Sequence, residues 1–101
     1  GFKKERGTPG QFRLVQNYPN PFNATTMIQF NLSEATRIEI NVYNLLGQKI
    51  KTLIDTTLAA GAYSITWDGK DDFQNDVSSG IYIYKIQVNE KVACKKMALV
   101  R

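Results

Sequence analysis

The sequence contains no histidine and only one cysteine, Cys94. Histidine is the commonest general base and the commonest transition-metal ligand, so its absence argues against most catalytic and metal sites. A single cysteine forms neither an internal disulfide nor a cysteine-based metal site. Because Cys94 lies among strand-forming residues, we expect a small buried hydrophobic side chain rather than a reactive thiol. The sequence therefore predicts no enzyme, no cofactor and no metal centre.

Long apolar runs and basic helices are missing as well. No apolar run approaches the about 18 residues that span a bilayer, and residues 1–12 lack the apolar stretch of a signal peptide. We therefore expect no stable insertion into a membrane. The formal charge of +4 could attract nucleic acid, but no recognition helix and no interleaving of basic with aromatic residues accompanies it. We expect no nucleic-acid partner.

The positive charge is concentrated at the end of the chain. Residues 1–84 contain eight basic and eight acidic residues, whereas the last seventeen contain one acid, Glu90, and five basic residues: Lys85, Lys91, Lys95, Lys96 and Arg101. The same stretch is strand-like. Basic residues on a terminal strand commonly protect an exposed sheet edge, and they can also be recognised by a protein that adds a strand there. The residues alone leave both interpretations open, with pairing of two copies through this edge as a further alternative.

The remaining residues indicate one all-β domain. Residues 1–12 combine charge with glycine and proline, which is typical of a linker or a cloning remnant, and residues 13–101 form the domain. Apolar and polar residues alternate at Ile28 to Leu32, Ile38 to Val42 and Tyr63 to Trp67. Further strands are expected at Gln48 to Ile54, Ile81 to Val88 and from Val92 onward. Six or seven strands without a helix predict an immunoglobulin-like antiparallel β-sandwich, with a small closed barrel as the alternative.

Turns and polar loops supply the remaining candidates. Pro19 and Pro21 exclude helix, and we expect Tyr18 and Phe22 beside them to pack inward. Trp67 alternates with apolar neighbours and is expected in the core rather than in a sugar-binding platform. Asp68 is expected to accept hydrogen bonds from turn amides, with Gly69 fixing the turn. The loop acids, without EF-hand spacing, leave a Ca²⁺ site as a minor alternative; they are Asp68, Asp71, Asp72 and Asp76.

The order of the motifs is more informative than any one of them. The sequence runs through Leu14-Val15-Gln16-Asn17-Tyr18-Pro19-Asn20-Pro21-Phe22-Asn23, Val42-Tyr43-Asn44-Leu45-Leu46-Gly47-Gln48, Ala60-Gly61-Ala62-Tyr63, Trp67-Asp68-Gly69, Ser79-Gly80-Ile81-Tyr82 and a terminal Lys95-Lys96-Met97 with Arg101. Over residues 13–101 it resembles the type A C-terminal sorting domain of the bacterial type IX secretion system. Two departures from the family pattern are Ala24 in place of proline and Gln74 in place of glycine.

The resemblance implies a role that composition does not show. Such a domain follows a cargo protein, here N-terminal to Gly1, which reaches the periplasm by general export and then passes the outer-membrane translocon to the cell surface or the medium. A sortase-like peptidase cleaves the linker, here residues 1–12. The recognised terminus would be Lys95, Lys96, Met97 and Arg101. The fold-motif positions would be Asn20, Pro21, Asn23, Gly47, Gly61, Trp67, Asp68, Gly69 and Gly80.

Other roles remain open on the sequence. Trp-Asp-Gly and Ser-Gly-Ile-Tyr also occur in the immunoglobulin-like domain of flagellar hook-capping proteins. A hook-cap-like or carbohydrate-binding interaction module is therefore an alternative, as is a structural spacer of a surface enzyme.

Overall fold

A computed structural model describes residues 11–101, so most of the predicted linker lies outside the described residues. Seven strands make up this part of the chain: β1 (Phe12–Leu14), β2 (Thr26–Leu32), β3 (Thr36–Asn44), β4 (Lys49–Leu58), β5 (Gly61–Trp67), β6 (Gly80–Val88) and β7 (Lys91–Leu99). The strand predicted to end at Ile54 continues to Leu58. Within residues 11–101 there is no helix long and apolar enough to cross a membrane.

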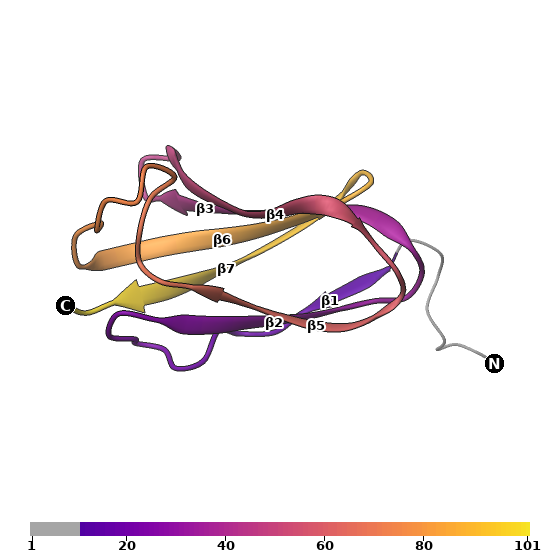
Figure 1. The fold of residues 1–101 in the computed structure, drawn as a ribbon, viewed down its shortest axis with the longest axis horizontal. Helices are drawn as coiled ribbons and strands as arrows, with labels where there is room; N and C mark the ends of the chain where they lie inside the picture. Colours follow the sequence, from indigo (N-terminus) through magenta and orange to yellow (C-terminus); the bar gives the residue numbers. More distant parts are fainter. Residues whose placement is uncertain (1–10) are drawn as a thin grey trace.

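The strands form two antiparallel sheets that face each other (Figure 1). One sheet has three strands in the order β1-β2-β5, and the other has four in the order β4-β3-β6-β7. The predicted immunoglobulin-like β-sandwich is thus confirmed, and the closed barrel is wrong because the two sheets remain separate. β6 is a central strand, whereas β7 lies at the edge of the four-stranded sheet.

The core lies between the sheets because the strands alternate in polarity. In β2, every second side chain from Thr26 to Leu32 is buried and those between are exposed. Trp67 is fully buried, and its ring packs against Tyr82 at 5.3 Å between centroids and against Phe22 at 5.7 Å. The predicted core role of Trp67 is confirmed, and tilted aromatic contacts of this kind stabilise a core beyond simple burial.

The described chain enters the sandwich at one end and leaves it at the other (Figure 1). β2 and β5 pair Thr26 with Trp67 at one end and Leu32 with Gly61 at the opposite end. Gln11 lies at the second of these ends, where its carbonyl oxygen accepts a 3.1 Å hydrogen bond from the Ser33 amide. Arg101 lies at the first. We call these the Gln11 end and the Arg101 end; the longest dimension of the domain is 47 Å.

The segment between β1 and β2, residues 15–25, crosses from the three-stranded sheet to the β7 edge of the four-stranded sheet, and we call it the crossing segment. It pairs with β2 through a bridge between Tyr18 and Met27 and then reaches β7 through a parallel bridge between Phe22 and Leu99. Phe22 is 1% exposed, as predicted, but Tyr18 is 80% exposed, so the prediction that it packs inward is wrong. The bridge to Met27 places Tyr18 on the outer side of the sheet, opposite the core.

Candidate functional site

The basic terminus folds as the second strand of a hairpin. β6 and β7 pair from Gly80 opposite Leu99 to Val88 opposite Lys91, with Asn89 at a φ of 56° in the connecting turn. This conformation is more accessible to asparagine than to most other residues. The terminus is therefore a strand that is fully paired with β6. Only its opposite edge and its side chains are available to bind another molecule.

The two adjacent lysines of the predicted recognition site point in opposite directions. Successive side chains of a strand alternate between faces. Lys96 is exposed on the outer face, whereas Lys95 shares the inner side with Met97 and is half-buried at the rim of the sandwich. Met97 itself is 1% exposed. Of these three residues, only the lysines reach the surface.

The exposure of Cys94 follows from the same alternation. Met97 and Leu99 are buried, so the odd-numbered positions of β7 face the core. Cys94 therefore lies on the outer face with Lys96 and is exposed. The prediction of a buried thiol is wrong, because strand-like neighbours did not reveal which of the two faces was covered.

Part of the free edge of β7 is already occupied by the crossing segment. The Phe22 amide donates to the Ala98 carbonyl oxygen at 2.9 Å, and the Val100 amide donates to the Phe22 carbonyl oxygen at 2.8 Å. The Asn20 Oδ1 atom accepts from the Ala98 amide at 2.9 Å. Asn20 and Phe22 thus act as a short strand beside residues 98–100.

One more side chain extends this cover toward the middle of β7. The Gln16 Nε2 atom donates to the Lys96 carbonyl oxygen at 2.8 Å. Beyond this point the crossing segment makes no hydrogen bond to β7 within the described residues. The edge is therefore covered from the Lys96 carbonyl group to Val100 and open from Lys91 to the Lys96 amide. Sequence reasoning missed this division, although the alternating prolines around Asn20 did indicate a stiff segment.

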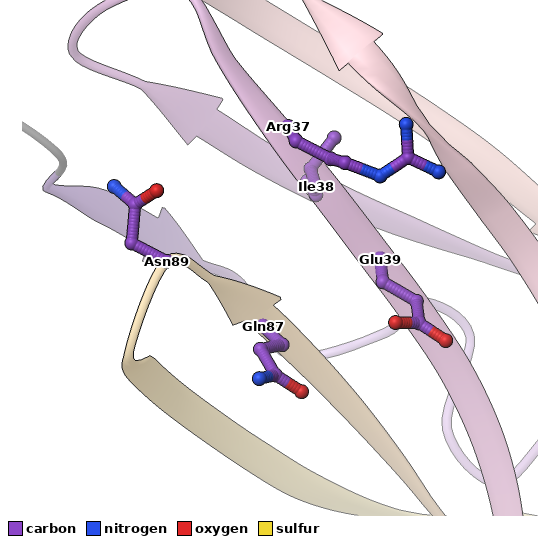
Figure 2. A pocket seen from close by; sticks show the side chains of 5 residues that line it. All are labelled: Arg37, Ile38, Glu39, Gln87 and Asn89. Atoms are coloured by element: carbon purple, nitrogen blue, oxygen red, sulfur yellow. The ribbon is translucent and has the colours of Figure 1, made fainter.

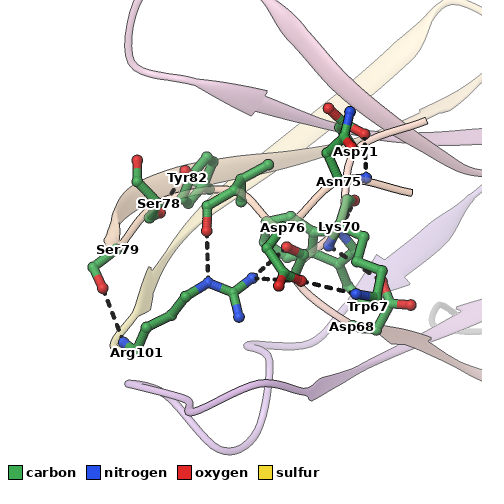
Figure 3. A network of polar contacts seen from close by, with 12 residues as sticks. Trp67, Asp68, Lys70, Asp71, Asn75, Asp76, Ser78, Ser79, Tyr82 and Arg101 are labelled. Carbon is green, nitrogen blue, oxygen red and sulfur yellow. Dashed lines mark hydrogen bonds and ion pairs between the residues drawn. The ribbon is translucent and has the colours of Figure 1, made fainter. Parts of the chain in front are cut away.

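The last residue, Arg101, is bound to the loop between β5 and β6 (Figure 3). Its backbone amide donates to Ser79 Oγ at 2.9 Å, its Nε atom donates to the Val77 carbonyl oxygen at 2.6 Å, and its Nη2 atom donates to the Gly69 carbonyl oxygen at 2.5 Å. Nη2 also lies 3.6 Å from an Asp76 carboxylate oxygen. The side chain predicted for recognition thus joins the chain end to residues 69–79.

Three of the four loop carboxylates have a partner within the loop, and the fourth, Asp72, accepts from the Thr52 amide of β4 at 3.1 Å. The hydrogen bond from Lys70, 2.8 Å long, holds the pKa of Asp76 below its ordinary value, and the charges of Lys70 and Arg101 act in the same direction. The backbone amides of Phe73 and Asn75 donate to Asp71 at 2.9 Å each, and that from Asn75 is the main reason its pKa is lowered. Within the described range, no three acids, cysteines or histidines gather to hold a metal ion.

The Trp67-Asp68-Gly69 turn holds this loop in position. As predicted, Asp68 accepts a hydrogen bond from a turn amide, that of Lys70, at 3.2 Å. The Trp67 Nε1 atom donates to the Lys70 carbonyl oxygen at 2.9 Å. Gly69 has a φ of 72°, and a Cβ there would lie 2.7 Å from Arg101 Nη2. Glycine is needed at this position for both its backbone conformation and its lack of a side chain.

The other motif positions lie in turns and at strand starts. Gly47 has a φ of 83° in the β3–β4 turn, where Asn44 Oδ1 accepts from the Leu46 and Gln48 amides at 3.0 Å each. Gly61 and Gly80 open β5 and β6. Asn23 is exposed, and Pro21 follows Asn20 through a cis peptide bond.

The two departures from the family pattern share a backbone feature. Ala24 has a φ of 78° and Gln74 a φ of 68°. Proline is restricted to a φ of about −65°, so the proline expected at position 24 would not fit this conformation. Glycine adopts a positive φ readily, so the glycine expected at position 74 would fit the observed loop.

The outer face of the four-stranded sheet has two shallow hollows. One, of about 250 Å³, is lined mostly by polar residues (Figure 2). It is lined by Arg37, Ile38, Glu39, Gln87 and Asn89, with Arg37 held by a 2.6 Å ion pair to Asp55. The other, of about 280 Å³, extends from the β3–β4 turn across β3 and β6 to β7 and is lined by Tyr43, Asn44, Leu45, Gly47, Ile83, Lys85 and Cys94. The second hollow places apolar surface next to the terminal strand.

A protein-family comparison covers nearly all of the described chain. The family model described as "Secretion system C-terminal sorting domain" matches residues 16–100. Comparison with curated protein sequences found no match.

Solved structures share the fold at low sequence identity. Dimeric latent PorU from Porphyromonas gingivalis aligns over 92% of this chain with a TM-score of 0.75 and 17% identity, and PorZ of the type IX secretion system of the same organism aligns over 86% with a TM-score of 0.57 and 19% identity. The aligned region is 10% of that PorU chain and 11% of that PorZ chain. A FlgD structure from P. aeruginosa aligns over 93% of this chain and 74% of its own, with a TM-score of 0.62 and 24% identity. These likenesses establish the fold alone.

Proposed function

We infer that this chain, which belongs to the family of secretion system C-terminal sorting domains, directs a cargo protein across the bacterial outer membrane through the type IX secretion system. The observation that carries the proposal is the family match over residues 16–100. The domain acts without catalysis, as a folded label on the cargo. The first part of its terminal strand, from Lys91 to the Lys96 amide, forms an open sheet edge, which supports recognition by a translocon component.

The recognition residues divide into two roles in this proposal. Lys95 and Lys96 reach the surface of the terminal strand and would contact the translocon. Met97 is buried, and the Arg101 guanidinium donates to carbonyl oxygens of the loop, so both would act by holding the strand in place. A receptor would then recognise a folded edge rather than a loose tail.

Gln11, the first described residue of the linker, and the terminus lie far enough apart to serve separate steps. Gln11 and Arg101 lie at opposite ends of a domain whose longest dimension is 47 Å. We propose that the cargo precedes Gly1 and that a sortase-like peptidase cleaves within residues 1–12 after passage. The cargo would cross the periplasm and finish at the cell surface or in the medium. This separation supports the proposal, because a peptidase could cleave the linker while β7 remains bound to the translocon.

A reporter fusion tests the role directly. Residues 1–101 are fused to the C-terminus of a periplasmic reporter in a type IX-competent bacterium, and reporter activity is compared between the cell surface, the medium and the periplasm. Export is expected for the wild-type domain and loss of export for Lys95→Glu/Lys96→Glu. The matched control is Lys49→Glu/Lys51→Glu on β4, which makes the same charge change at the opposite edge. Retention of the wild-type fusion in the periplasm overturns the proposal.

The carbohydrate-binding alternative loses its main support. It depends on Trp67 as a stacking platform, and this side chain is fully buried in the core. The similarity to FlgD shows a shared fold but does not indicate a shared function, because the sequence identity is only 24%. A structural spacer remains the competing role, and it predicts no export in the same fusion experiment.

A further inference from the structure

We propose that the open part of β7, Lys91 to Lys96, binds an extended acidic segment of a partner protein by strand addition, with an apolar side chain of that segment in the hollow beside Cys94. This inference deepens the proposed function, on which it rests for the identity of the partner as a translocon component. The binding itself can be tested without export.

The backbone groups available for strand addition follow from the β6–β7 pairing. The outward bonds at Lys96, Ala98 and Val100 show that even-numbered residues direct their amides and carbonyls away from β6. By the alternation of an antiparallel strand, the same holds for Val92 and Cys94. Within the described chain, no hydrogen bond from the crossing segment to these two residues is found. An added strand would therefore bond to Val92, Cys94 and the amide of Lys96.

The crossing segment limits where an incoming strand can lie. Gln16 occupies the Lys96 carbonyl oxygen, and Asn20 and Phe22 occupy the groups of Ala98. A partner strand thus ends near Lys96 and extends toward the β6–β7 turn, at the Gln11 end of the domain. The site accommodates about five or six residues, the usual length of a short strand.

The side chains around this open edge define the chemistry of the partner. Lys96 lies on its outer face, Lys95 on its inner side, and Lys91 beside the turn, where Glu90 is the neighbouring acid. Opposite charges across paired strands stabilise a sheet. An incoming segment should therefore place acidic residues opposite Lys95 and Lys96.

The hollow adds an apolar requirement on the outer face. Cys94 and Ile83 line it, and the Lys85 Nζ atom lies 5.0 Å from the centre of the Tyr43 ring in the same hollow. A residue of the added strand that lies next to Cys94 on this face would project over the hollow. A valine, leucine or aromatic side chain would bury apolar surface there.

The β4 and β5 edges fit such a partner less well. On β4, Asp72 already pairs with the Ile50 carbonyl oxygen and the Thr52 amide, and two register shifts interrupt its pairing with β3. β5 carries no charged residue from Gly61 to Trp67. A second copy of this chain would bring lysines against lysines at β7, and like charges directly opposite are unfavourable.

The test is an NMR titration of the full chain with a seven-residue synthetic peptide that carries two central glutamates flanked by valines and threonines. Shift changes are expected at the amides of Val92, Cys94 and Lys96, with little change at those of Ala98 and Val100, which already have partners. The control peptide has lysines in place of the glutamates and should bind about tenfold more weakly, since two ion pairs are lost. Lys95→Glu/Lys96→Glu should reverse this preference, and Lys49→Glu/Lys51→Glu should preserve it.

Two variants separate strand addition from general charge attraction. Cys94→Pro removes an outward amide that β6 does not use, and it should abolish binding while Cys94→Ser retains it. If Cys94→Pro fails to fold, a peptide N-methylated at alternate residues on its bonding side replaces it and should not bind.

The proposal is overturned by equal binding of both peptides, by shifts confined to other surfaces, by binding of the N-methylated peptide, or by a stable dimer in ultracentrifugation. Export by Lys95→Glu/Lys96→Glu despite lost peptide binding also overturns it and leaves the sorting role standing. Retention of the wild-type fusion overturns the sorting role instead.

Discussion

The guanidinium of Arg101 occupies the space that a side chain at residue 69 would fill. Its Nη2 atom donates to the Gly69 carbonyl oxygen at 2.5 Å, and a Cβ on Gly69 would lie 2.7 Å from the same nitrogen. The last residue and the Trp67-Asp68-Gly69 turn are thus fitted to each other. Two motifs about thirty residues apart in the sequence form one structural unit.

Replacing Gly69 by alanine should therefore destabilise the domain for two reasons. A φ of 72° is strained for alanine, and the new methyl group would displace Arg101. The strain costs about 1–2 kcal/mol and the lost hydrogen bonds about 1 kcal/mol more, measured as the free energy of unfolding in urea.

The control for this substitution is Gly47→Ala. Gly47 has a φ of 83°, but no atom outside its two chain neighbours lies within 4 Å of the position of its Cβ, so only the strain applies. Combining Gly69→Ala with Arg101→Ala should cost less than the sum of the two single changes, because the displaced side chain is then absent. Strict additivity would contradict the fitted arrangement.

Asn20→Ala should loosen the covered end of β7. The substitution removes the acceptor of the Ala98 amide, which Asn20 Oδ1 contacts at 2.9 Å. We expect a loss of about 0.5–1.5 kcal/mol in unfolding free energy and faster hydrogen exchange of the Ala98 amide. Asn23→Ala is the matched control, since Asn23 is exposed in the same segment and should tolerate the change. Unchanged exchange at Ala98 would show that the cover does not protect this edge.

The architecture could be predicted from the sequence because it depends on alternation, which is a local property. Ile28 and Phe30 alternate with polar residues, and they are buried as expected. The core position of Trp67 followed in the same way from its apolar neighbours in β5. For such residues, the covered face of the strand is evident from the pattern itself.

The errors arose where a side chain's surroundings depend on distant segments. Tyr18 was expected inward because aromatic residues favour cores, but its pairing with Met27 turns it to the outside. Cys94 lies between residues without a clear pattern, so only the burial of Met97 reveals which face it occupies.

Arg101 was not expected to have a structural role, because its partners are carbonyl groups. Its side chain donates to the Gly69 and Val77 carbonyl oxygens. Because every residue has a backbone carbonyl group, the sequence does not indicate which of them will accept a hydrogen bond. The division of the β7 edge was equally hidden, since it depends on contacts of Gln16 and Asn20 with a strand about eighty residues away.

Gln74→Gly should stabilise the domain. Gln74 has a φ of 68° in the loop after the Trp67-Asp68-Gly69 turn, and glycine adopts this conformation without steric cost. After the greater entropy that glycine gives the unfolded chain is subtracted, a gain of about 0.5–1 kcal/mol in unfolding free energy is expected. Gln48→Gly, at a position without a positive φ, should destabilise instead. A loss of stability in Gln74→Gly would contradict the observed backbone conformation.

Tyr84→Phe should destabilise the domain at neutral pH and flatten its response to alkali. The Tyr84 hydroxyl accepts from the buried Asn17 amide and donates to the partly buried Val15 carbonyl oxygen, both at 2.8 Å. Its loss leaves these groups unpaired at a cost of about 1–3 kcal/mol. Burial raises the pKa of Tyr84 to about 12, above the unfolded value of about 10. The fold therefore favours the protonated hydroxyl, and this contribution to stability is complete below about pH 10 and is lost as the pH rises toward about 12.

Urea unfolding at about pH 8 and about pH 11 measures this effect. The unfolding free energy should decline less between these pH values in Tyr84→Phe than in the wild type. Tyr18→Phe, at an 80% exposed position, is the control for removing a hydroxyl. An equal decline in the wild type and Tyr84→Phe would mean that this hydroxyl does not couple folding to alkaline pH.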